Sequence, residues 1–140
     1  MYLLDTNVVS ELARRQPDPG VTNFFARVKG NEEPVYLSVL TIGEINKGIR
    51  RLIRYGDQDQ ADRFGRWLSA LEDDYTDHLL PIDGDVSRIW GAMLAATDDT
   101  NAIDKLIAAT AVVYGLTLVT RNVAHVAGTG VTCIDPFGVR

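Results

Sequence analysis

Short apolar runs alternate with longer amphipathic stretches along the whole chain. Runs of three to five apolar and β-branched residues predict buried strands at 2–4, 35–37, 79–82, 116–120 and 131–134. Between them, apolar residues recur at helical spacing and predict helices at about 8–15, 21–28, 42–53, 57–74, 86–96 and between Asn101 and Gly115. Expected N-caps are Ser38 or Thr41 for the third of these helices and Asp83 for the fifth.

Strands that alternate with helices indicate βα units. They predict an α/β fold with three α/β/α layers, in which helices cover both faces of a mainly parallel sheet of about four to five strands. Right-handed crossovers would place the carboxyl ends of all these strands at one edge. That edge is where an open α/β sheet binds its ligand.

Composition limits the possible classes of protein. The chain has 140 residues, 46% of them hydrophobic, and a net charge of −5, which fits one domain spanning 1–140 and excludes a disordered chain. No apolar run approaches the roughly 20 residues needed to cross a membrane. The sequence shows no export leader, and its single cysteine, Cys133, cannot form an internal disulfide. We therefore expect a cytoplasmic protein. The acidic balance argues against binding nucleic acid by bulk charge but permits a local basic groove.

Oxygen-bearing side chains from four distant segments fall at the carboxyl edge of the predicted sheet. Asp5 follows the first strand, Glu44 is expected in the first turn of the helix after the second, Asp104 lies three residues after Asn101, and Asn122 follows the fourth strand. Singly, each has a structural explanation: Thr41-x-x-Glu44 is a capping box, and Asp104 suits a helix dipole.

Together these carboxylates predict a different role. Clustered carboxylates need a compensating cation, and an all-oxygen set without His or Cys suits Mg²⁺ or Mn²⁺. The chemistry implied is metal-assisted hydrolysis of a phosphodiester.

Basic residues near this edge are candidates for binding phosphate. Lys47 and Arg50 lie on the helix that carries Glu44, where a solvated surface is an equal explanation, and Arg121 directly follows the fourth strand. Asp98 and Asp99, in the connection before Asp104, are candidates for supplementing the acidic site, although a solvated loop also explains them.

Four ordered blocks resemble the PIN-domain VapC ribonuclease toxins of type II toxin–antitoxin systems. The blocks are Leu3-Leu4-Asp5-Thr6-Asn7-Val8-Val9-Ser10-Glu11, Leu37-Ser38-x-x-Thr41-x-x-Glu44-Ile45-x-x-Gly48, Asp104-x-Leu106-Ile107-Ala108-Ala109-Thr110-Ala111 and Leu116-Thr117-Leu118-Val119-Thr120-Arg121-Asn122. The Ser-Glu ending of the first block, followed by Arg15, Pro17 and Pro19, is most similar to the FitB-like branch. The resemblance spans nearly the whole chain and implies a single PIN domain over 1–140.

The resemblance also implies a function and a set of site residues. It implies a Mg²⁺-dependent endoribonuclease, with Mn²⁺ as a substitute, that acts on structured RNA such as tRNA. The metal ligands would be Asp5, Glu44 and Asp104, with Asn122 at a fourth catalytic position. Supporting polar positions would be Thr6, Asn7 and Thr120. The family usually has Asp-Phe where this chain has His125-Val126, so the chain departs from the family pattern at this position.

Partners follow from the same resemblance. It implies a homodimer that is held inactive by a VapB/FitA-like antitoxin. The C-terminal segment of the antitoxin would lie over the site. The DNA-binding part of the antitoxin would bring the complex to operator DNA.

Two other readings remain open. A phosphotransferase that forms an aspartyl-phosphate also has an Asp after its first strand. However, it usually needs an acid at the position of Asn7 and a late Lys that this chain lacks. A catalytically weakened PIN-fold binding module that acts with an antitoxin in DNA-bound regulation is the alternative that Asn122 and His125 favour.

Overall fold

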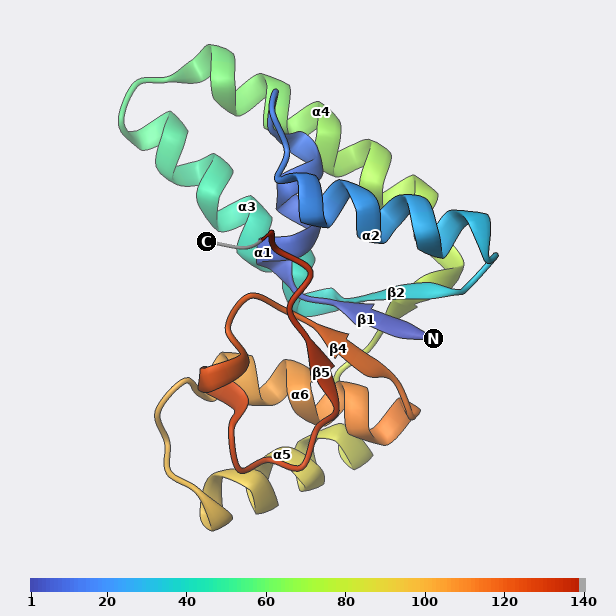
Figure 1. The fold of residues 1–140 in the computed structure, drawn as a ribbon. Coiled ribbons are helices and arrows are strands. Elements are labelled where there is room, and N and C mark those ends of the chain that lie inside the picture. The colour runs from blue at the N-terminus through green and yellow to red at the C-terminus, as the bar shows by residue number, and fades with distance from the viewer. Residues whose placement is uncertain (139–140) are drawn as a thin grey trace.

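A parallel sheet forms the middle layer of the molecule (Figure 1). The structure is a computed structural model that describes residues 1–138. Within this range five strands lie in the order β3-β2-β1-β4-β5, and every neighbouring pair is parallel. Their bounds are β1 Tyr2–Leu4, β2 Val35–Ser38, β3 Leu79–Leu80, β4 Thr117–Val119 and β5 Cys133–Ile134. The expected α/β fold with a parallel sheet is confirmed.

Helices cover both faces of this sheet (Figure 1). One face carries α1 (Thr6–Val9), α2 (Pro19–Gly30), α3 (Val39–Arg54) and α4 (Gln58–Asp74), and the other carries α5 (Gly84–Ala96) and α6 (Ala102–Tyr114). Short 3₁₀ helices lie at Ser10–Ala13 (η1), Thr76–His78 (η2) and Val123–Val126 (η3). None of the helices within residues 1–138 combines the length and apolarity that crossing a bilayer requires.

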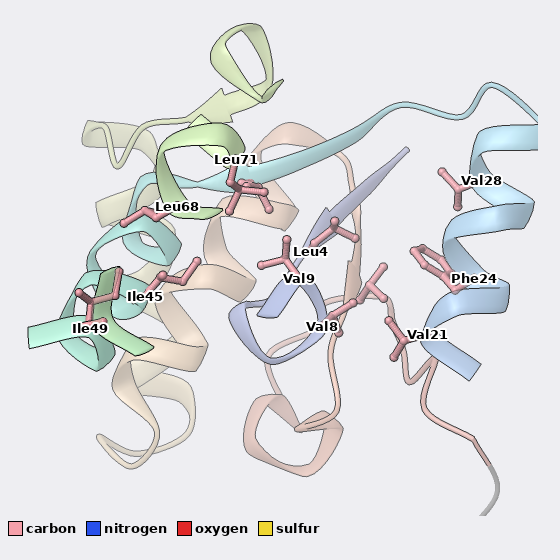
Figure 2. Packing of buried hydrophobic residues seen from close by; sticks show 13 residues of the cluster. Leu4, Val8, Val9, Val21, Phe24, Val28, Ile45, Ile49, Leu68 and Leu71 are labelled. Carbon is pink, nitrogen blue, oxygen red and sulfur yellow. The ribbon is translucent and has the colours of Figure 1, made fainter. Parts of the chain in front are cut away.

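Alternating side chains of the strands fill two hydrophobic layers. On β1, Leu4 packs with α1, α2 and α4 residues, whereas its neighbour Leu3 packs with α5 and α6. Figure 2 shows the first layer, where Val21, Phe24 and Val28 of α2 approach β1 from one side. Because each such side chain contributes about 1.5–3 kcal/mol on burial, these layers fix the positions of the helices relative to the sheet.

The register of the sheet aligns the ends of its strands. Tyr2 lies opposite Val35 of β2 and opposite Thr117 of β4. The residues that follow β1 and β4 therefore meet at the same edge, where the backbone N–H of Asp5 donates to Val119 O at 2.9 Å. The functional candidates after these strands are brought together by strand pairing, as predicted for parallel βα units.

The first helix differs from the 8–15 prediction at both ends. It begins at Thr6 because the carboxylate of Asp5 caps it and accepts the Thr6 N–H. The α-helix continues directly as the 3₁₀ helix η1, which ends before Arg14, where the backbone is extended. A carboxylate at the end of a strand can start a helix at once, without an intervening loop.

Two expectations about capping also need correction. Ser38, and not Thr41, caps α3, because its hydroxyl accepts the Leu40 N–H at 3.1 Å. The capping-box explanation of Thr41 and Glu44 is therefore wrong: Thr41 is fully buried inside the helix. Asn101 precedes α6 as expected, but its backbone is left-handed (φ 53°), and in the described chain its side chain makes no capping bond.

Candidate active site at the carboxyl edge of the sheet

Asp5 lies at the centre of the candidate site and is almost entirely buried, with 5% of its surface exposed. Its Oδ2 accepts a hydrogen bond from the Thr120 hydroxyl at 2.7 Å, and its Oδ1 accepts the Thr6 N–H at 2.7 Å. Asn7 Nδ2 lies 3.4 Å from Oδ2. Thr6, Asn7 and Thr120, predicted as supporting residues, all contact the carboxylate of Asp5.

Burial raises the pKa of Asp5 above its ordinary value. Hydrogen bonds from Thr120 and Thr6 lower that pKa in part, whereas the negative charges of Asp104 and Glu44 raise it further. Asp104 and Glu44 are thus each near enough to repel the carboxylate of Asp5. Positive charge placed among them would favour the ionised form of Asp5.

Glu44 approaches the site from α3 and is held there by a threonine. The Thr6 hydroxyl lies 2.6 Å from Glu44 Oε1 and 3.1 Å from the hydroxyl of Thr41. Glu44 is the sixth residue of α3 and lies in its second turn, so the expectation of a first-turn position is wrong. The reason is that the helix begins directly after β2, at Val39.

Asp104 enters the site from the first turn of α6, as predicted. Its Oδ2 lies 2.8 Å from Nδ1 of His125, which belongs to η3 after β4. In the sequence His125 is a departure from the family pattern, and its contact with Asp104 was not predicted. The structure makes it a direct partner of a predicted metal ligand.

Each of the three carboxylates is therefore engaged with a protein partner. Among residues 1–138, no group of three or more His, Cys, Asp and Glu side chains is gathered as a ready-made metal site. The chemistry of the donor set nevertheless fits a hard divalent cation. The three carboxylates offer only oxygen ligands, and the buried Asp5 is repelled by the negative charges of Asp104 and Glu44.

Two further site candidates, Arg121 and Asn122, directly follow Thr120 after β4. Asn122 donates its backbone N–H to the Thr120 hydroxyl at 3.0 Å and precedes η3. Arg121 donates its backbone N–H to Asn7 Oδ1 at 3.2 Å, and its guanidinium carbon lies 4.6 Å from the centre of the Phe137 ring. The contact with Phe137 was not predicted, because the two residues belong to separate segments that no motif connects.

The two basic candidates on α3 lie in different surroundings. Lys47 lines a shallow depression together with Glu44 and Ile103. Arg50 lines a separate depression between α3 and α4, with Ile53 and Ser69. Lys47 is therefore the one of these two that adjoins a site carboxylate.

Asp98 does not supplement the acidic site. Its carboxylate accepts a hydrogen bond at 3.0 Å from Nζ of Lys105, a lysine with 3% of its surface exposed. Hydrogen bonds from Thr100 and then from Lys105 lower the pKa of Asp98 to about 2. The hydrogen bond from Lys105 ties the connection between α5 and α6 to the first turn of α6. The sequence did not indicate this pair, because a lysine side chain is seldom buried.

An apolar groove adjoins the site on its α3 side. It has a volume of about 430 Å³, and Thr6 and Glu44 line one end of it. The rest is formed by residues of η1, α3 and α4, among them Gly48, Leu52 and Trp67. Ile45, Ile49 and Phe64 are further apolar residues of these two helices that line the groove. The structure places them along a surface that opens next to the carboxylates.

Comparison with known proteins identifies the family of the chain. The PIN domain model matches residues 2–126. The chain is 32% identical to VapC ribonuclease Y4jK of Sinorhizobium fredii, over 98% of both chains. It is 30% identical to toxin FitB of Neisseria gonorrhoeae, over 98% of this chain and 99% of that one. The chain belongs to the PIN-domain family and, within it, to the VapC and FitB toxins.

Solved structures agree with this assignment. The structure of FitAcB from Neisseria gonorrhoeae matches 97% of this chain and 98% of its own, with a TM-score of 0.86 and 29% identity. FitAB bound to an IR36 DNA fragment matches with a TM-score of 0.85 and 27% identity, over 100% of this chain and 98% of that one. VapBC2 from Rickettsia felis, at 18% identity and a TM-score of 0.70, shares the fold.

Proposed function

We propose that this chain is the toxin of a type II toxin–antitoxin module and a Mg²⁺-dependent endoribonuclease that hydrolyses phosphodiester bonds of structured RNA, with tRNA as the first candidate. The observation that carries the proposal is the buried Asp5, whose pKa is raised by burial and by the charges of Asp104 and Glu44. Such an arrangement is stabilised by a bound divalent cation. The PIN-domain membership and the VapC ribonuclease relative support the choice of RNA.

Asp5, Glu44 and Asp104 would hold the cation, for which Mn²⁺ is a substitute. The bound ion supplies an activated water and neutralises charge that develops on the phosphodiester. Thr120 and the Thr6 N–H fix the orientation of Asp5, and the Thr6 hydroxyl fixes Glu44. Asn122 would complete the site as a neutral oxygen donor, and Arg121 and Lys47 would bind phosphates beside it.

Expression and cleavage together test this proposal. Induced expression of the wild type should arrest growth, and the purified protein should cleave RNA only when Mg²⁺ or Mn²⁺ is added. Asp5→Ala should abolish both effects while the protein remains folded, and sequencing of cleaved RNA ends should identify the target. Full activity in excess chelator would exclude the metal mechanism.

A second candidate function is a catalytically weakened PIN module that acts with an antitoxin in DNA-bound regulation. The contact between His125 and Asp104 favours it, because it engages one carboxylate with an imidazole. The two functions differ in a simple outcome. If the wild type and Asp5→Ala are equally harmless on expression and equally inert towards RNA pools, the binding module is the correct reading.

We assign the two proposed protein partners to two apolar surfaces. The 430 Å³ groove beside Glu44 would receive the C-terminal segment of a VapB/FitA-like antitoxin, consistent with the FitAB and VapBC complexes among the structural neighbours. Val39 (38% exposed) and Ile103 (48% exposed) would contact a second copy of the chain. Sedimentation analysis of Ile103→Asp tests the homodimer, and binding to operator DNA through the antitoxin is tested by gel shift of the complex.

A further inference from the structure

The last described segment of the chain packs tightly against the start of α2. Gly138 donates its backbone N–H to Asp18 Oδ1 at 2.9 Å, across 120 positions of sequence. A Cβ atom built at Gly20 would lie 2.2 Å from the carbonyl oxygen of Pro136 and 2.6 Å from the nitrogen of Gly138. Backbone meets backbone here without space for a side chain. The tail, residues 135–138, is thereby fixed at the site edge, and Figure 2 shows it beside the first turn of α2.

Phe137 of this tail connects the site to the hydrophobic core. Its ring packs on the layer formed with α1 and α2, and the guanidinium carbon of Arg121 lies 4.6 Å from the ring centre. The backbone of Arg121 is held separately by Asn7 Oδ1. Arg121 is therefore fixed at its backbone and at its charged end, although the residue as a whole is exposed.

Asp18 adds charge to the same arrangement. The Gly138 N–H is the largest cause that holds the pKa of Asp18 below its ordinary value, and the Gly20 and Val21 N–H groups act in the same direction. The positive charge of Arg121 contributes as well. Asp18 thus remains ionised, holds the tail through its backbone bonds and attracts the guanidinium towards the tail.

Arg121 differs in position from the other arginines that lie over aromatic rings. Among the described residues, Arg27 lies over Phe24 of α2 and Arg63 lies over Phe64 of α4. Arg121 instead follows Thr120, the residue whose hydroxyl binds Asp5. A guanidinium that stacks by its face keeps its edge N–H groups available for a phosphate.

We propose that the C-terminal tail is a positioning device for RNA binding, in which Phe137 holds Arg121 in place to contact an RNA phosphate flanking the carboxylates. This inference rests on the proposed function, because it takes RNA as the substrate. Phe137 is a positioning residue and does not contact the RNA. Its effect is to reduce the side-chain freedom that Arg121 would otherwise lose on binding.

A double-mutant cycle tests the proposal. All variants carry Asp5→Asn, so that a fluorescein-labelled RNA stem-loop remains intact, and binding is followed by anisotropy over a series of salt concentrations. Arg121→Gln should weaken binding by about tenfold and reduce the salt slope by about 0.7–0.9. Phe137→Leu, which keeps apolar bulk but removes the ring, should weaken binding by about threefold. The double variant should bind no more weakly than Arg121→Gln alone.

Matched controls separate this role from packing and from bulk charge. Phe25→Leu removes a partly buried ring from the same hydrophobic layer, and Arg27→Gln removes an arginine that lies over another ring. Both controls should bind RNA within about twofold of the parent. Phe137→Tyr keeps an aromatic ring and should bind RNA as tightly as the parent. In NMR spectra, the ring-current shift of the Arg121 side-chain protons should be present in Phe137→Tyr and absent in Phe137→Leu.

The possible outcomes are distinct. Unchanged binding in Phe137→Leu, or an equal loss in the Arg121→Gln background, would overturn the positioning role. Unchanged binding in Arg121→Gln would overturn the phosphate contact. Cleavage by the protein with Asp5 intact is measured separately with Mg²⁺. If no cleavage is found, the nuclease proposal is overturned. The role of Phe137 is then still decided by the RNA-binding measurements on the four variants.

Discussion

Nδ1 of His125 lies 2.8 Å from Oδ2 of Asp104. The contact joins the helix that follows β4 to the helix that carries the third predicted metal ligand. It therefore decides how much of the Asp104 carboxylate is available to a cation.

Replacing this imidazole by a carboxylate should strengthen metal binding. His125→Asp frees Asp104 and adds one negative charge, so we expect Mn²⁺ to bind about three- to tenfold more tightly, measured by calorimetric titration. His78→Asp, at the other histidine of the chain, is the matched control. Weaker binding in His125→Asp would show that the imidazole positions Asp104 for the metal.

Asp5→Asn should separate activity from stability. We expect RNA cleavage to fall by at least about 100-fold, because Asp5 is a proposed metal ligand. Because burial raises the pKa of Asp5, the folded state favours the protonated carboxyl group over the ionised one. The stability that the protonated carboxyl group contributes is therefore lost as pH rises through its pKa in the folded state. In chelator at neutral pH, the amide should therefore leave the thermal midpoint unchanged or higher. Asp74→Asn, on an exposed helix end, is the control, and a lower midpoint would contradict the sign of the effect.

Loss of the hydroxyl of Thr120 should reduce activity through the orientation of Asp5. Thr120→Val keeps the shape of this buried residue but removes the 2.7 Å hydrogen bond. We expect cleavage to fall by about 10- to 100-fold and stability by about 1 kcal/mol. Thr120→Ser should retain most activity. Equal losses in the Ser and Val variants would assign the effect to packing.

The fold and most of the site could be predicted from the sequence, because each depends on local pattern. Apolar runs gave the strands, and parallel topology brought Asp5 and Thr120 to one edge. What could not be predicted depends on contacts between distant segments. His125 on Asp104 is one such contact, and Phe137 under Arg121 is another. The wrong capping box shows a further limit: Ser38 and Thr41 are both good caps by composition, and only the exact end of β2 decides between them.

The pairing of Asp98 with Lys105 should make stability depend on pH. The pKa of Asp98 is about 2, below the ordinary value of 3.8, so the stabilisation is present above about pH 4 and is lost as pH falls towards 2. Asp98→Asn should lower the urea midpoint at about pH 6, and this difference should shrink steadily as pH falls from about 4 towards 2. Asp99→Asn is the neighbouring control. If the two urea midpoints differ as much at about pH 2 as at about pH 6, then Asp98 stabilises the fold without its negative charge.

Filling the apolar groove should block the antitoxin without damaging the fold. A Cβ atom at Gly48, on α3, meets no other atom within 4 Å, so Gly48→Gln adds a side chain at the groove and should stabilise the helix by roughly 0.5–1 kcal/mol. Antitoxin binding, measured by calorimetry, should weaken at least about tenfold while RNA cleavage persists. Gly91→Gln on α5 gives the same helical gain on the opposite layer. Equal antitoxin binding by both variants would place the antitoxin elsewhere.

The hydrogen bond between Thr120 and Asp5 spans 115 positions of sequence. During synthesis, β1 leaves the ribosome first, but it acquires its β4 neighbour only after most of the chain has been made. A nascent chain shorter than this cannot hold the Asp5 carboxylate in its final orientation. If the proposed RNA cleavage is correct, a nascent chain that still lacks β4 would be inactive beside the ribosome, and activity would appear only once synthesis is nearly complete.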